Sequence, residues 1–309
     1  MNKTISTLKF LIGWPLSIAA LFFLIKLAIP KFSFVKEQIE SVNLIILFLA
    51  VILFISYFFL RCFLWKTILD YKGHKLSFKK TAYLWGFSEF KRYVPGNIWS
   101  FLSRVSLFAS EGIDKKIVGL ALLDEIQLII VSSTIISIFA LPLILAAEVE
   151  QIKGFLLGLF IGMAIYAVIV SYIYKKRTKQ GTFLSNIYLP NHTLSQKITL
   201  TLVSVFTFFV FGFATFIACL SITSFNLNLS LILSSFFVFA LLVGYLSFIT
   251  PMGLGVREGV VTIGLTPIIG LSTAGFLSIF SRVILMLSEI TFLILILLWD
   301  KLIKGVSKK

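Results

Sequence analysis

The chain has 309 residues, of which 59% are hydrophobic and 13% are charged. Soluble domains carry about 25% charged residues, and several apolar runs here reach the roughly 20 residues that cross a bilayer. The composition therefore excludes an ordinary soluble protein and predicts an all-α, polytopic integral membrane helical bundle. Because the longest connection, 175–197, is too small to fold alone, we expect a single transmembrane domain over residues 1–309.

The net charge of +15 comes from basic residues that stand mostly at the ends of apolar runs. That placement is the topology signal of membrane proteins, and it attracts anionic lipid rather than nucleic acid. Cys62 and Cys219 lie in or beside apolar runs, and His74 and His192 are isolated. We therefore expect no disulfide framework, no metal site and no cofactor.

The apolar runs predict about eight spans. In chain order they are residues 10–29, 44–64, 117–146, 155–174, 199–222, 229–248, 256–271 and 272–299. The run at 10–29 is too long for the core of a signal peptide, and the run at 256–271 is an interrupted crossing because it contains Gly264, Pro267 and Gly270.

Both termini and alternate connections are rich in lysine and arginine. The basic connections are 61–80, the pair Lys115 and Lys116, and the cluster 175–179. Basic segments stay cytoplasmic, so we predict a multi-pass protein of the plasma membrane with both termini in the cytoplasm.

The first interruption of the helical pattern lies between Lys91 and Arg104. Pro95 has no N–H and suits the first turn of a helix, and Gly96 lets a partner approach the backbone. Residues 81–90 are too short to cross, so with this break they predict a re-entrant hairpin. The new helix would present its positive dipole end beside Lys91 and Arg92, where an anion could bind.

A second break with similar chemistry lies at residues 249–258 and includes Pro251, Gly253 and Gly255. Each half of the chain thus has ordinary spans and one Pro/Gly-broken element. Matching broken segments in two halves mark the transport site of inverted-repeat transporters.

The charged residues at the breaks allow two interpretations. Arginine offers a fork that suits phosphate, but Lys91 and Arg92 could also flank a membrane segment and extend to its surface. Glu258 stands where a carboxylate caps a helix, or it pairs with a cation. For Arg257 the ligand-binding interpretation is favoured, since intramembrane arginine is rare without a partner or ligand.

Two later helices also carry acidic or basic residues. Asp124 and Glu125 are adjacent, about 100° apart on a helix, so only one is expected to face the interior. Arg282 and Glu289 are seven residues apart on nearly one face, which is compatible with a structural ion pair or with a place in the site.

These residues resemble motifs of the lysylphosphatidylglycerol synthase transmembrane region. The first resembling stretch is Lys91-Arg-Tyr-Val-Pro-Gly-Asn-Ile-Trp with Arg104 behind it, followed by Asp124-Glu125. The second is Pro251-Met-Gly-Leu-Gly-Val-Arg-Glu258, in which Met252 replaces a common glycine. The resemblance also favours Glu125 over Asp124 as the interior carboxylate.

The best-known members of that family, the multiple peptide resistance factors, join this membrane region to a soluble aminoacyl-transferase domain. Their membrane region is implicated in flipping the aminoacylated lipid, and other members stand alone or are fused to glycosyltransferases. Since no connection here is long enough for a soluble domain, the resemblance implies a flippase-like membrane protein rather than a synthase.

We therefore expect a protein that binds, and translocates between leaflets, an anionic lipid such as an aminoacylated phospholipid or a polyprenyl-phosphate glycan. The candidate substrate-binding residues are Lys91, Arg92, Tyr93, Pro95, Gly96, Asn97, Arg104, Glu125, Pro251, Gly253, Gly255, Arg257, Glu258, Arg282 and Glu289.

Two other functions stay open: a non-catalytic membrane subunit that presents lipid to a separate soluble transferase, and an ion-coupled transporter of a soluble anion. No catalytic constellation or phosphate-binding loop is found, so catalytic residues are not assigned. A soluble transferase and a second copy of the chain are the partners considered beside the lipid, and nucleic acid is not expected.

Overall fold

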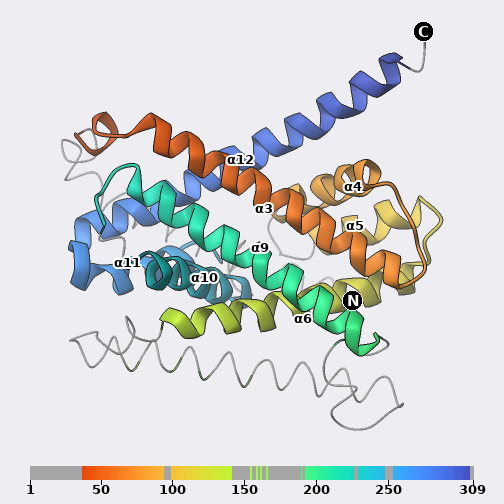
Figure 1. Cartoon of the computed structure of the whole chain (residues 1–309), viewed down its shortest axis with the longest axis horizontal. Helices are drawn as coiled ribbons and strands as arrows, with labels where there is room; N and C mark the ends of the chain where they lie inside the picture. The colour runs from red at the N-terminus through yellow and green to blue at the C-terminus, as the bar shows by residue number, and fades with distance from the viewer. Residues whose placement is uncertain are drawn as a thin grey trace, which may run out of the picture.

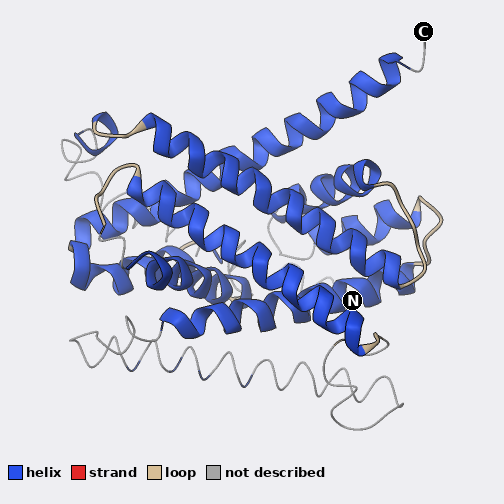
Figure 2. Cartoon of the chain, viewed as in Figure 1, coloured by secondary structure: helices blue, strands red, loops and turns tan. Residues whose placement is uncertain are grey.

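The computed structural model describes residues 37–93, 99–140, 192–225, 229–247 and 253–306, together with the single positions 154, 158, 161, 165 and 189. Within these residues the regular structure is entirely helical (Figure 2). Four helices in this part of the chain are long and apolar enough to cross a membrane. The protein is therefore an all-α membrane protein, as its composition predicts.

The first half begins with the long helix α3, Leu44–Tyr71, which Asn43 caps by accepting hydrogen bonds from two backbone N–H groups. The short helix α4, Phe78–Phe90, follows and ends in the 3-10 turn η2, Lys91–Tyr93. After the first break come the short helix α5, Trp99–Ala109, and the long helix α6, Lys115–Ser137, extended by the turn η3, Ile138–Ala140.

The second half repeats this order. The long helix α9, Leu194–Leu220, starts at a capping box formed by Thr193 and Gln196. The short helix α10, Ser230–Leu246, leads to the second break, and the short helix α11, Val256–Ile269, leads away from it. The long helix α12, Leu271–Val306, then completes the half.

Corresponding helices of the two halves make corresponding contacts. α3 contacts α9 along its length, α6 packs on α9, and α12 packs on α3. The backbone N–H of Asn43, before α3, donates to the carbonyl of Ser221, after α9, at 2.7 Å, so these central helices run antiparallel. In Figure 1 the pair α4 and α5 lies at one end of the central helices and the pair α10 and α11 at the other.

The helix lengths change part of the predicted topology. α10 has 17 residues and α11 has 14, fewer than the roughly 20 that cross a bilayer. The predicted crossing at 256–271 is therefore too short as folded, and α10 reaches only the lower limit of about 17 residues for the predicted crossing at 229–248. α10 and α11 flank the second break as α4 and α5 flank the first. The predicted spans at 10–29 and 155–174 lie outside the described residues.

Glycines let the short helices approach the long ones closely, as small residues commonly do in membrane proteins. A Cβ atom on Gly212 of α9 would lie 2.3 Å from the carbonyl oxygen of Ser234 in α10. A Cβ atom on Gly264 of α11 would lie 2.0 Å from the ring of Phe236 in α10. The first contact fixes α10 against the long helix α9, and the second fixes α11 against α10.

Candidate functional site

The first break separates two helices that both point buried polar groups into the protein. Glu89 lies in the last turn of α4 and Arg104 in the middle of α5, and both side chains are buried. Arg92 and Tyr93, in the turn η2, are half-buried, whereas Lys91 at the end of α4 is exposed. Pro95, Gly96 and Asn97 lie outside the described residues.

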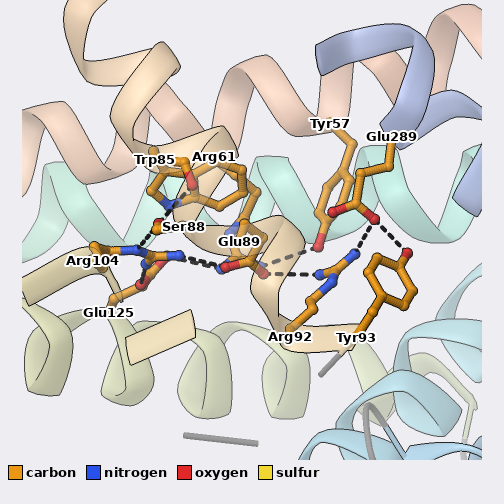
Figure 3. A network of polar contacts seen from close by, with 10 residues as sticks. All are labelled: Tyr57, Arg61, Trp85, Ser88, Glu89, Arg92, Tyr93, Arg104, Glu125 and Glu289. Carbon is orange, nitrogen blue, oxygen red and sulfur yellow. Dashed lines mark hydrogen bonds and ion pairs between the residues drawn. The ribbon is translucent and has the colours of Figure 1, made fainter. Parts of the chain in front are cut away.

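Three arginines and three glutamates form one alternating chain of ion pairs (Figure 3). Glu125 accepts from Arg61 at 2.8 Å and also from Arg104. Arg104 donates in turn to Glu89. Arg92 then joins Glu89, at 2.9 Å, to Glu289 of α12, at 2.6 Å. The chain therefore connects α3, α6, both short helices of the first break, and the last long helix.

Aromatic and hydroxyl groups hold the guanidinium groups of this chain in place. The Arg104 guanidinium carbon lies 4.9 Å from the ring centroid of Trp65 and 5.1 Å from that of Trp85. Its Nε donates to Ser88 at 3.0 Å. Such ring faces attract cations where water is scarce, so they stabilise a charge that burial would otherwise penalise.

Glu89 and Tyr93 lie outside the four long helices, and burial and nearby charges shift their pKa values. Burial opposes ionisation of Glu89, but Arg92 and the other arginines of the chain lower the pKa of its carboxyl to about 2. Burial raises the pKa of Tyr93 to about 12, and its hydroxyl donates to Glu289 at 2.6 Å. At neutral pH Glu89 is therefore a carboxylate and Tyr93 a neutral donor.

The second break is fixed by a close backbone crossing. Gly253 has a φ of +64°, and a Cβ atom there would lie 2.5 Å from the Cα atom of Gly244 in α10. Gly255, with a φ of +84°, begins α11, and its N–H donates to the Glu258 carboxylate at 2.7 Å. Only glycine adopts these angles readily and admits this approach. Pro251 lies outside the described residues.

Glu258 fills both roles that its position predicts, since it caps α11 and also accepts a hydrogen bond from Arg282 of α12. Two alternatives were open for Arg282 and Glu289, a structural ion pair or a place in the site, and among the described residues these two side chains do not pair with each other. Each residue instead pairs with a residue of a break, Arg282 with the second and Glu289 with the first. Residues seven positions apart on α12 are separated by about 10 Å along the helix axis, whereas neighbouring elements bring Glu258 and Arg92 within ion-pair distance.

Arg257 is buried at the start of α11, and within the described residues no carboxylate pairs with it. Its guanidinium carbon lies 5.1 Å from the ring centroid of Phe211 in α9. Burial and the nearby charge of Arg282 lower its pKa to about 10, which leaves the group cationic at neutral pH. Arg257 is therefore the candidate cation for binding an anionic ligand, because the described carboxylates of the site pair with other residues.

Asp124 and Glu125 are both buried, which corrects the expectation that only one faces the interior. They serve different clusters, because adjacent helix positions point in different directions. Asp124 accepts from Lys72 at 2.7 Å and contacts the His192 Nε2 at 2.9 Å. His192, isolated in the sequence, thus anchors the connection before α9 to α6.

The sequence analysis missed three members of the site. Arg61 reads as part of a basic connection, but α3 continues to Tyr71 and buries it. Glu89 stands directly before the first break, and Tyr57, one turn before Arg61 in a run of aromatic residues, accepts a hydrogen bond from the Arg61 guanidinium at 3.2 Å. For Arg61 and Glu89, a charged residue inside an apolar run was the available signal.

Comparison with protein families gives one match. The sequence profile of the lysylphosphatidylglycerol synthase TM region matches residues 7–294. The chain belongs to this family. A comparison with curated proteins finds no match. The family match covers both breaks and all nine charged residues of the two clusters, so the resemblance predicted from the motifs is confirmed.

Proposed function

We propose that this family member binds the anionic head group of a membrane lipid between its two breaks and moves that lipid between leaflets. One observation supports this most directly: five arginines lie buried or half-buried at the two breaks of a chain that is otherwise largely apolar. Charge within a bilayer is costly, and it commonly marks substrate and ion pathways.

The placement of the breaks suits alternating access. The long helices α3 and α9 run antiparallel, and each leads into a short-helix pair with a break. We propose that the two breaks therefore open toward opposite faces of the membrane, as in inverted-repeat transporters. With the basic segment 72–80, which follows α3, in the cytoplasm, the first break opens to the cytoplasm and the second to the opposite face.

In this mechanism Arg257 receives the phosphate while the acyl chains stay in the lipid. Arg92 and Tyr93 hold Glu289, so they join the first break to the last helix of the second half. We propose that this link closes one side of the pathway, and that its rearrangement accompanies opening of that side. The protein would act in the plasma membrane with both termini cytoplasmic. Treating α10 and α11 as a re-entrant pair keeps the number of crossings even.

The test is leaflet exchange in liposomes that contain the purified protein and fluorescent anionic phospholipids. We expect exchange with the wild type, and at least a tenfold lower rate with Arg257→Gln. The matched control is Lys116→Gln, which removes an exposed cation at the start of α6 and should keep the wild-type rate.

Failure of the wild type to exchange any lipid in the panel would overturn the proposal. If lipid still bound in an Arg257-dependent way, the second function, presentation of lipid to a soluble transferase, would replace it. Exchange that Arg257→Gln leaves unchanged would show that the lipid travels by a path outside the two breaks.

A further inference from the structure

We propose that the site takes a lipid whose head group is a phosphodiester with a single negative charge, and that Arg257 pairs with that charge. This inference deepens the proposed function and rests on it. It follows from counting the charges that the described residues bury around the two breaks.

The first break is already electrically balanced. Its alternating chain runs Arg61, Glu125, Arg104, Glu89, Arg92 and Glu289, with an ion pair at every step. Three positive charges face three negative charges. An anion that took one of these arginines would remove an ion pair from at least one buried carboxylate and leave the group with an excess negative charge, and breaking a buried pair costs about 3–5 kcal/mol.

The second break has one positive charge more than its carboxylates balance. Glu258 pairs with Arg282, which leaves Arg257 as the odd cation of this group. The separate pair of half-buried Lys72 and buried Asp124 is balanced by itself. The break segments 94–98 and 248–252 contain no charged residue, so they do not alter the count. Around the breaks, the described residues thus include five arginines, four buried and Arg92 half-buried, against four buried glutamates.

The packing around Arg257 holds its side chain in place and leaves its guanidinium group available to a ligand. A Cβ atom on Gly244 would lie 3.0 Å from the Arg257 Cβ, so α10 packs directly against the base of the side chain. Phe211 covers one face of the guanidinium, and the residue remains 7% exposed. The planar fork of a guanidinium can bind two oxygens of one phosphate together.

The surplus of one charge sets the class of anion. A phosphodiester carries one negative charge and would bring the buried group to neutrality. A phosphomonoester carries about −1.5 to −2 at pH 7, and a diphosphate also carries more than one charge. Either would place an unbalanced negative charge in a low-dielectric site, where such charges are strongly penalised. Polyprenyl-monophosphate sugars and phosphoglycerol lipids fit this charge, whereas diphosphate-linked lipids do not.

The test is binding of short-chain lipids to the detergent-purified protein at about pH 8, where a phosphomonoester is close to doubly charged. Dihexanoyl phosphatidylglycerol supplies the phosphodiester and dihexanoyl phosphatidic acid the phosphomonoester. We expect the phosphodiester to bind at least tenfold more tightly. Glycerophosphoglycerol, which lacks acyl chains, should bind at least tenfold more weakly than phosphatidylglycerol if the ligand is a lipid.

Arg257→Gln should weaken phosphatidylglycerol binding at least tenfold, whereas Arg257→Lys, which keeps the charge, should retain most of it. Lys116→Gln should bind as the wild type does. Equal or tighter binding of phosphatidic acid by the wild type would overturn the inference even if the Arg257 variants failed to fold. So would phosphatidylglycerol binding that survives Arg257→Gln.

The two proposals fail separately. Leaflet exchange without a preference for the single charge would overturn the charge argument and leave the translocation proposal standing. Selective, Arg257-dependent binding without exchange would keep the charge argument and overturn translocation. Glycerophosphoglycerol binding as tight as that of phosphatidylglycerol would assign the site to a soluble anion instead.

Discussion

Glu125 is the residue on which most of the first cluster depends. It accepts hydrogen bonds from Arg61 of α3 and Arg104 of α5, and all three side chains are buried. A carboxylate shared by two guanidinium groups neutralises part of each charge in a place that water does not reach. Its loss would leave both arginines with less compensation than burial requires.

We expect Glu125→Gln to lower the free energy of unfolding by about 3–5 kcal/mol, because it removes one partner from buried ion pairs. Thermal unfolding of the detergent-purified protein, followed by tryptophan fluorescence, measures the effect. The matched control is Glu111→Gln, which breaks a more exposed pair with Lys80 and should cost about 0–1 kcal/mol. Equal losses in the two variants would contradict a structural role for Glu125.

At the scale of elements, the breaks are held by glycines as much as by charges. α9 and α10 cross where Gly212 meets the backbone of Ser234, and the second break crosses α10 at Gly244. The absence of side chains at these points lets backbones touch, which is the usual way that membrane helices pack tightly. The position of Arg257 therefore depends on helix crossings remote from any charge.

Gly212→Ala should destabilise the protein by about 1–3 kcal/mol, because the new methyl group overlaps the Ser234 carbonyl and forces the helices apart. Gly119→Ala in α6 is the matched control, since a Cβ atom there meets nothing within 4 Å. That control should be neutral or gain up to about 1 kcal/mol from better helix propensity. Thermal unfolding of both variants in one detergent decides the point, and a tolerated Gly212→Ala would show that α9 and α10 can separate at little cost.

At the scale of the whole molecule, the order long helix, short helix, break, short helix, long helix occurs twice. The central helices run antiparallel, and α6 and α12 each pack on the central helix of the opposite half. Figure 1 shows the short-helix pairs at opposite ends of this arrangement. It places the start of α3 beside the end of α9, and therefore on one side of the membrane.

Cysteine labelling in sealed vesicles tests this arrangement. The native cysteines, Cys62 and Cys219, are buried and should give little background. Ser41→Cys and Ser224→Cys should react with a membrane-impermeant maleimide from one side, and Lys75→Cys from the other, because all three positions are exposed. Labelling of Ser41→Cys and Ser224→Cys from opposite sides would rule out the antiparallel crossing of α3 and α9, and labelling of Lys75→Cys from the same side as Ser41→Cys would rule out a crossing by α3.

The sequence by itself determined the membrane class, the family, the two breaks and most of the charged residues near them. Those features are local: an apolar run of sufficient length must form a helix in lipid, and Pro, Gly and charge interrupt it visibly. The helices on the two sides of the first break, α4 and α5, could be predicted for the same reason, because Pro95 and Gly96 mark where one ends and the other begins. The place of Arg257 at the start of a helix could also be predicted, because Gly255 before it ends the break.

Only the tertiary structure decided which charges meet. Arg282 and Glu289 share a helix face, yet they pair with Glu258 and Arg92 on other elements. Arg61, Glu89 and Tyr57 joined the site because α3, α4 and α6 bring them together. Ion pairs form between side chains that packing places within a few ångströms, whatever their separation in sequence. The sequence therefore determined which charges the membrane must bury, and helix packing determined that Arg257 alone among those arginines would lack a carboxylate partner within the described residues.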